Sequence, residues 1–234
     1  VKYTHNPGHE DTPDDPSYVK ETGHPAYRAD DALWLFPTIY KYIAESGNIG
    51  FIDEVIPFAN KDEGTVYEHL KRAIDFSMNR LGDNGMPAGL HADWNDCLRL
   101  GKNGESSFVA MQLYYAFTIM RKFAEKKNDT EYISYLDKTQ KDIGEKINKL
   151  WWEDDRFNRG FKETGELIGS KKDPEASMWL NPQTWSVISG LATREQADKA
   201  MASVDRELNT AYGAKIMAPS YVDLSLIHIS EPTR

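Results

Sequence analysis

Two neighbouring runs decide the fold: SSFVAMQLYYAFTIMRKFAEK at residues 106–126 and TEYISYLDKTQKDIGEKINKL at residues 130–150. The first run repeats apolar residues at helical spacing on more than one side, which predicts a buried helix. The second run is amphipathic and sets its apolar stripe against a face of Lys, Glu and Asp. An outer helix covering an inner one is typical of a layered or toroidal all-α domain.

The same apolar spacing predicts further helices on both sides of this pair. The additional helices are expected from about residue 30 to a stop at Gly47, over residues 65–81, over residues 183–191, and over residues 194–208 after the N-cap candidate Thr193. Residues 157–168 contain several glycines and fit a short β-hairpin or an irregular loop. The chain is therefore expected to be all-α, with only short β-hairpin insertions.

Composition excludes several classes of protein. The chain has 234 residues, with 28 Lys and Arg against 37 Asp and Glu, which gives a net charge of −9. An acidic chain without a basic block argues against nucleic acid as a partner. No apolar run reaches the roughly 18 residues of a membrane-spanning helix, so no membrane partner is expected. The lone Cys97 excludes an intrachain disulfide and favours a reducing, cytoplasmic location.

The densest polar and aromatic cluster is GLHADWNDC at residues 89–97, before the predicted buried helix. Carboxylates and amides bind sugar hydroxyls, and the indole of Trp94 suits the apolar face of a pyranose ring. A structural alternative is equally open on composition alone, with Asp93 or Asp96 capping a helix and Trp94 filling the core.

A second cluster, HPAYRADD at residues 24–31, precedes another predicted helix. On these residues alone, Asp30 or Asp31 is better explained as a helix N-cap. A functional role gains weight from the first cluster, because in a toroid both segments would open at the same end. The histidines lack the spacing of metal ligands, so no metal site is expected.

These segments resemble a known family of enzymes. YRADDALWL at residues 27–35, GLHADWNDCLRLGKNGES at residues 89–106 and WLNPQTWSVISG at residues 179–190 resemble the inverting disaccharide phosphorylases of the cellobiose and chitobiose phosphorylase family, glycoside hydrolase family 94. The resemblance implies an (α/α)6-barrel catalytic domain, of which this chain would be an incomplete toroid. It also implies phosphorolysis of a β-linked, cellobiose-like disaccharide to an α-sugar 1-phosphate and a free sugar.

The family pattern also implies residue roles. The last carboxylate of the DWND motif is the general acid, which falls on Asp96, and inorganic phosphate replaces water as the co-substrate, with no cofactor. Protonation of Asp96 in the substrate complex would require a raised pKa, to which Asp93 is a candidate contributor. The residues that would contact sugar are Arg28, Asp30 or Asp31, His91, Trp94 and Asn95.

The resemblance further suggests how the chain is organised. Residues 1–23 are expected to be a loop or severed linker, residues 24–223 a partial catalytic barrel, and residues 224–234 a non-native, adapter-like tail. Such a truncated chain is expected to be inactive alone, and the whole protein to form a homodimer. The alternatives are an (α/α)6-barrel hydrolase using water and a non-catalytic carbohydrate-binding fragment.

Overall fold

The two runs at the centre of the sequence form the two longest helices. The computed structural model describes residues 28–58, 62–90, 92–95, 98–101 and 103–222. Helix α4 (Ser107–Lys127) begins where the Ser106 hydroxyl accepts the backbone N–H of Val109, and it is buried along most of its length. Helix α5 (Thr130–Trp151) buries one stripe against α4. The predicted inner and outer pair is confirmed.

The other predicted helices also form. They are α2 (Leu35–Ser46), α3 (Val66–Met78), α6 (Leu180–Ile188) and α7 (Arg194–Glu207), with short 3-10 turns η1 (Asp31–Trp34) and η2 (Ile49–Asp53) around α2. Gly47 ends α2 in the left-handed conformation, and Thr193 closes a capping box at the start of α7. Helix α6 begins three residues earlier than predicted.

Helix α3 ends before the predicted position, at Met78 instead of Leu81. The chain there turns back on itself, because the carbonyl of Arg80 accepts the N–H of Ala88 at 2.9 Å and Leu81 pairs with Pro87. This return brings the C-terminal end of α3 to the first turn of α4, where the Ser106 N–H donates to the Pro87 carbonyl.

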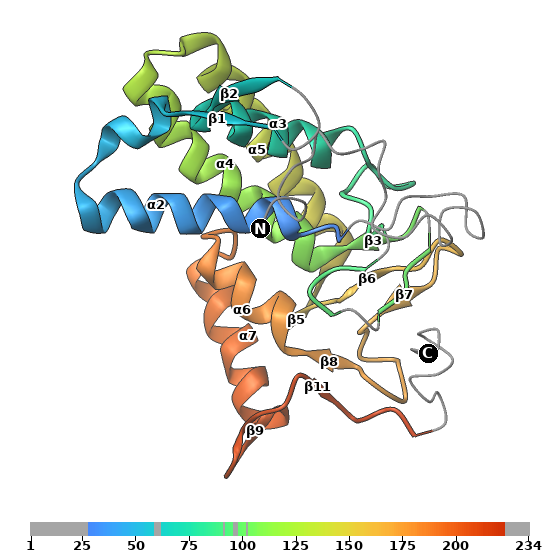
Figure 1. Cartoon of the computed structure of the whole chain (residues 1–234). Coiled ribbons are helices and arrows are strands. Elements are labelled where there is room, and N and C mark those ends of the chain that lie inside the picture. Colours follow the sequence, from blue (N-terminus) through green and yellow to red (C-terminus); the bar gives the residue numbers. More distant parts are fainter. Residues whose placement is uncertain (1–27, 59–61, 91, 96–97, 102, 223–234) are drawn as a thin grey trace, which may run out of the picture.

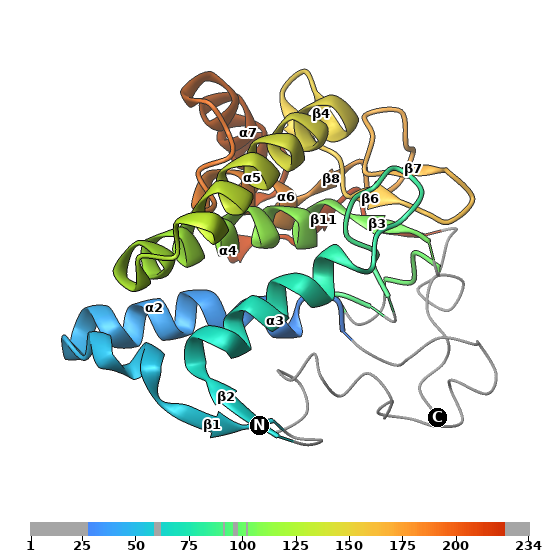
Figure 2. The same ribbon diagram turned by 90° about the horizontal axis from the view of Figure 1, so that it is seen from above.

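Alternate helices lie side by side. Helix α4 contacts α2 and α6 as well as the sequence neighbours α3 and α5, and α6 in turn contacts α7. Figure 2 shows α3 and α5 on opposite sides of α4, while Figure 1 shows α6 and α7 below it. This alternation is that of an incomplete (α/α)6 toroid, so the predicted fold class is confirmed. No helix within the described ranges is long and apolar enough to cross a membrane.

Short antiparallel strands gather beside the helices (Figure 1). They pair as β1 (Val55–Pro57) with β2 (Glu63–Thr65), β4 (Trp152–Glu153) with β5 (Arg156–Phe157), β8 (Met178–Trp179) with β11 (Met217–Ala218), β9 (Asn209–Thr210) with β10 (Gly213–Ala214), and β6 (Gly160–Phe161) with both β3 (Glu105–Ser106) and β7 (Leu167–Ile168). The β6–β7 pair is the hairpin that the glycines predict. The other pairs carry too few residues to leave a periodic signal.

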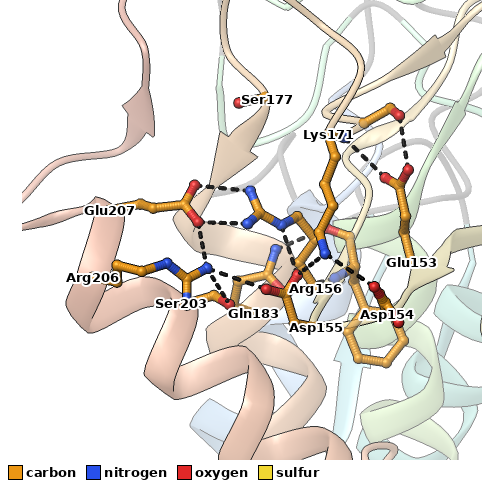
Figure 3. Close-up of polar contacts among 12 residues, drawn as sticks. Glu153, Asp154, Asp155, Arg156, Lys171, Ser177, Gln183, Ser203, Arg206 and Glu207 are labelled. Atoms are coloured by element: carbon orange, nitrogen blue, oxygen red, sulfur yellow. Dashed lines mark hydrogen bonds and ion pairs between the residues drawn. The ribbon is translucent and has the colours of Figure 1, made fainter.

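A polar network fastens α7 to the β4–β5 hairpin (Figure 3). The Arg156 guanidinium donates to both Glu207 carboxylate oxygens, at 2.9 and 2.5 Å, and to Asp155 at 3.0 Å. Burial alone would raise the pKa of the Asp155 carboxyl, but hydrogen bonds from Arg156 and Lys171 hold it well below its usual range. Near this network Gln183 is fully buried and clamps the backbone N–H and carbonyl of Phe157.

Candidate active site

Two segments that are distant in sequence meet at one end of the helices. The Ala29 N–H donates to the Ala92 carbonyl at 2.8 Å, and Arg28 forms isolated bridges with Leu90 and Ala92. Residues 28–30, which lead into η1, therefore lie against Leu90 and Ala92, which precede α4 in the chain. The two polar clusters of the sequence are neighbours in the structure, as the toroid predicts.

Asp30 is a buried acid at this junction. Its side chain is 2% exposed, and one carboxylate oxygen accepts the Trp34 indole N–H at 2.7 Å. Burial raises the pKa of Asp30 to about 6; the Trp34 hydrogen bond opposes this shift, and the negative charge of Asp93 adds to it. Asp30 occupies the N-cap position of η1, but its side chain caps no backbone N–H, so the capping explanation is wrong for this residue. Asp31 follows in the first turn and is partly exposed.

Asp93 faces inward, while the next residue faces solvent. The Asp93 carboxylate is 2% exposed and accepts the Asn95 backbone N–H at 2.9 Å. Trp94 is 50% exposed, so the alternative in which it fills the core is wrong. The exposed indole is available to stack on a sugar ring. Asp96 and His91, together with Cys97, lie outside the described residues.

Arg159 holds Asp93 in place, and sequence reasoning missed it. The guanidinium is fully buried and donates to both Asp93 carboxylate oxygens, at 2.7 and 2.5 Å, and to the Ser106 hydroxyl at 3.0 Å. A signal was present in FNRGF, where Arg159 falls in alternation with the aromatic residues Phe157 and Phe161. A cation at an inward position among aromatics indicates a buried ionic partner.

A second buried carboxylate secures the base of the loop. Glu105 accepts the backbone N–H groups of Asn84 and Met86, at 2.9 and 3.0 Å, and the Asn84 side-chain amide at 2.8 Å. Gly104 lies directly against the backbone of Leu100, which leaves no space for a side chain there. The chain directly before α4 is thus fixed by the buried polar bonds of Glu105 and by close backbone packing at Gly104.

A cavity of about 310 Å³ lies beyond this loop. It is lined by Leu98, Arg99, Lys162, Glu166, Leu167, Ile168, Asp173, Pro174, Glu175 and Tyr221. Burial, with added repulsion from Asp173 and Glu175, raises the pKa of the Tyr221 hydroxyl to about 12. Across the described part of the chain, no group of three or more His, Cys, Asp or Glu side chains is arranged to hold a metal ion.

The fold has a counterpart among solved structures. It superposes on the family 78 rhamnosidase of Bacillus sp. GL1 with a TM-score of 0.60 at 14% identity, covering 86% of this chain and 20% of the other. This likeness concerns the fold alone. The family follows from sequence: the model of the glycosyl hydrolase 94 superfamily catalytic domain matches residues 4–231, and the chain belongs to that family.

Relatives of known activity carry the same segment. The chain is 39% identical over 198 residues to the N,N'-diacetylchitobiose phosphorylase of Vibrio proteolyticus, covering 82% of this chain and 24% of that protein. It is 32% identical over 203 residues to the solabiose phosphorylase of Paenibacillus borealis, covering 85% of this chain and 26% of that protein. The chain spans about a quarter of the length of these relatives.

Proposed function

We propose that the whole protein containing this chain cleaves a β-linked disaccharide with inorganic phosphate. The products would be an α-sugar 1-phosphate and a free sugar, formed with inversion at the anomeric carbon. Membership of glycosyl hydrolase family 94 and the two phosphorylases described above support this reaction. The proposal includes a cytoplasmic enzyme that uses phosphate as co-substrate and no cofactor.

The meeting of the two polar clusters is the observation that carries the proposal. The Ala29 to Ala92 hydrogen bond brings the Arg28 to Asp31 segment beside the segment that bears Trp94 and Asn95. Sugar recognition requires several hydroxyl-binding groups and an apolar ring face within one small region. In this proposal Arg28, with Asp31 or Asp30, holds the donor sugar.

The reaction needs one acid, and we assign that role to Asp96. Glycosidic cleavage requires a proton on the leaving oxygen, and an inverting hydrolase also requires a carboxylate base that activates water. Phosphate is already an anionic nucleophile, so it makes such a base unnecessary. Asp93 is unsuited to act as a base, because donors from Arg159, Ser106 and the Asn95 backbone occupy its oxygens.

The disaccharide class follows from the named relatives. Both are phosphorylases of disaccharides, and the more similar one acts on N,N'-diacetylchitobiose. We therefore propose cellobiose and N,N'-diacetylchitobiose as the two substrates to compare. His91, close to Asp96 in sequence, is the residue proposed to sense the acceptor sugar.

A phosphorolysis assay on the whole protein tests the function. Release of sugar 1-phosphate from either disaccharide, followed by phosphorus NMR, should depend on added phosphate and give the α-anomer. Asp96→Asn should lower kcat by a factor of about 10²–10⁴, the contribution that general acid catalysis makes. The matched control is Asp142→Asn, a change at an exposed residue of α5. Phosphate-independent release of two free sugars would instead establish a hydrolase, and sugar binding without turnover a carbohydrate-binding protein.

A further inference from the structure

Arg159 contacts the candidate site although it lies far from it in sequence. It lies 66 residues from Asp93, yet its guanidinium bonds to both carboxylate oxygens of that residue and to the Ser106 hydroxyl. Ser106 also donates to Asp93 at 2.7 Å and caps α4. The loop at 93–95 and the first turn of α4 therefore share one buried cation.

The backbone of Arg159 is fixed on both sides. Its N–H donates to the Ile168 carbonyl at 2.7 Å, and its carbonyl accepts the Ser107 N–H at 3.1 Å. The guanidinium lies between the Phe108 and Trp179 rings, at 5.9 and 5.4 Å from their centroids. Arg159 is thus a rigid point in the fold, from which the orientation of Asp93 is set.

This orientation extends to the residues that face solvent. Asp93 directly precedes Trp94 and accepts the N–H of Asn95, whose carbonyl in turn accepts the Leu98 N–H at 2.9 Å. The two terminal nitrogens of the Arg159 guanidinium bind different groups: Nη2 donates to both oxygens of Asp93, and Nη1 donates to the Ser106 hydroxyl. The rigid planar fork therefore fixes the carboxylate relative to Ser106, which a flexible ammonium would not do. Rotation of the Asp93 carboxylate would therefore displace the backbone at Asn95.

We propose that Arg159 is a positioning residue, which orients the segment at 93–95 for sugar contact through its paired bonds to Asp93 and Ser106. This inference rests on the proposed function of the site. Arg159 is fully buried, so its effect on the loop would pass through Asp93 and Ser106. The fork geometry of the guanidinium, rather than its charge alone, is the property that matters.

The first test measures backbone exchange in this chain and requires no activity. Arg159→Lys should speed amide hydrogen exchange at Asn95 and Leu98 by about tenfold or more, because their hydrogen bonds depend on the Asp93 orientation. Arg156→Lys is the matched control, since Arg156 is also a buried guanidinium that donates to both oxygens of one carboxylate, and that carboxylate lies at the end of α7 instead (Figure 3). Equal acceleration of these two amides in both variants would overturn the proposal.

The second test uses turnover by the whole protein. Arg159→Lys should lower kcat by about a hundredfold, the size expected when a catalytic loop shifts by about 1 Å. Because Trp94 and Asn95 are proposed to contact the sugar, KM for the disaccharide should rise as well, and Arg156→Lys should leave both constants near the wild-type values. Wild-type kcat in the Arg159→Lys enzyme would refute the positioning role.

A double variant covers the case in which Arg159→Lys does not fold. Replacing a buried ion pair by apolar residues often preserves stability, so Asp93→Leu with Arg159→Met should keep the urea midpoint while still lowering kcat. Wild-type turnover in that variant would show that the pair positions nothing. If the wild-type protein lacks phosphorolysis, the proposed function fails, and the exchange comparison still decides whether Arg159 orients the loop.

Discussion

Asp30 makes the stability of this chain depend on pH in an unusual direction. Its pKa rises from 3.8 in the unfolded chain to about 6 in the folded chain, mainly because the carboxyl is buried. Below pH 3.8 both states hold the proton and Asp30 contributes no difference. Between pH 3.8 and about 6 only the folded state keeps the Asp30 proton. The free energy of unfolding therefore falls by about 1.4 kcal/mol per pH unit in this range and levels off above pH 6.

The total cost of ionising Asp30 follows from the shift. A difference of about two pKa units corresponds to about 3 kcal/mol, of which about 2 kcal/mol develops between pH 4.5 and 7.5. Since Asp30 is only 2% exposed, screening by water removes little of this energy. Asp30→Asn keeps an oxygen for the Trp34 indole N–H and cannot ionise.

Urea unfolding of the wild type and of Asp30→Asn, measured across that pH range, tests the reasoning. The free energy of unfolding of Asp30→Asn, relative to that of the wild type, should increase by about 2 kcal/mol between pH 4.5 and 7.5. The contributions of all other carboxyl groups cancel in this difference. Asp198→Asn, an exposed change on α7, is the control and should run parallel to the wild type. A constant difference between wild type and Asp30→Asn, or a carbon NMR titration of Asp30 near pH 4, would refute the assignment.

Three further changes test a close backbone contact, a buried hydrogen-bond clamp and a helix cap. Gly104→Ala should destabilise the chain by about 1–3 kcal/mol in urea, because the new methyl group meets Leu100; a change below about 0.5 kcal/mol would contradict the close packing. Gln183→Leu should cost about 1–3 kcal/mol in thermal unfolding, since it strands the N–H and carbonyl of Phe157, and an unchanged Tm would show that these groups find other partners. Thr193→Ala should cost about 1 kcal/mol by removing the α7 cap, with Thr193→Ser retaining stability by the same measurement.

The helices were predictable because each carries its own signal. The spacing of apolar residues at 106–126 and at 130–150 alone predicts two helices and which faces of them are buried. The hydroxyl of Thr193 predicts the N-cap of α7. The end of α3 was misplaced because Arg80 and Leu81 bond to a returning segment, which spacing cannot reveal. Among the short strands, only the β6–β7 hairpin was indicated, through its glycines, because the other strands carry too little pattern.

The candidate site was only partly predictable for a related reason. Residue types indicated sugar chemistry in the cluster at 89–97, but the inward turn of Asp93 depends on Arg159, 66 residues away in the chain. Gln183 likewise is a buried residue whose side chain bonds to the N–H and carbonyl of Phe157, 26 residues away in the chain. Pairing between polar residues that are distant in sequence produces no repeating pattern in the sequence. Only the structure shows which of these polar residues are buried.

The distance along the chain between Asp93 and Arg159 also has a consequence during synthesis. The ribosome adds about 5–20 residues per second, so the 66 residues that separate the pair take about 3–13 s to appear. Throughout that interval the loop at 93–95 exists without its cation, even though α3 has already been made. The nascent chain must therefore keep the Asp93 carboxylate hydrated until the β5–β6 region emerges, which makes the site one of the later features to assemble.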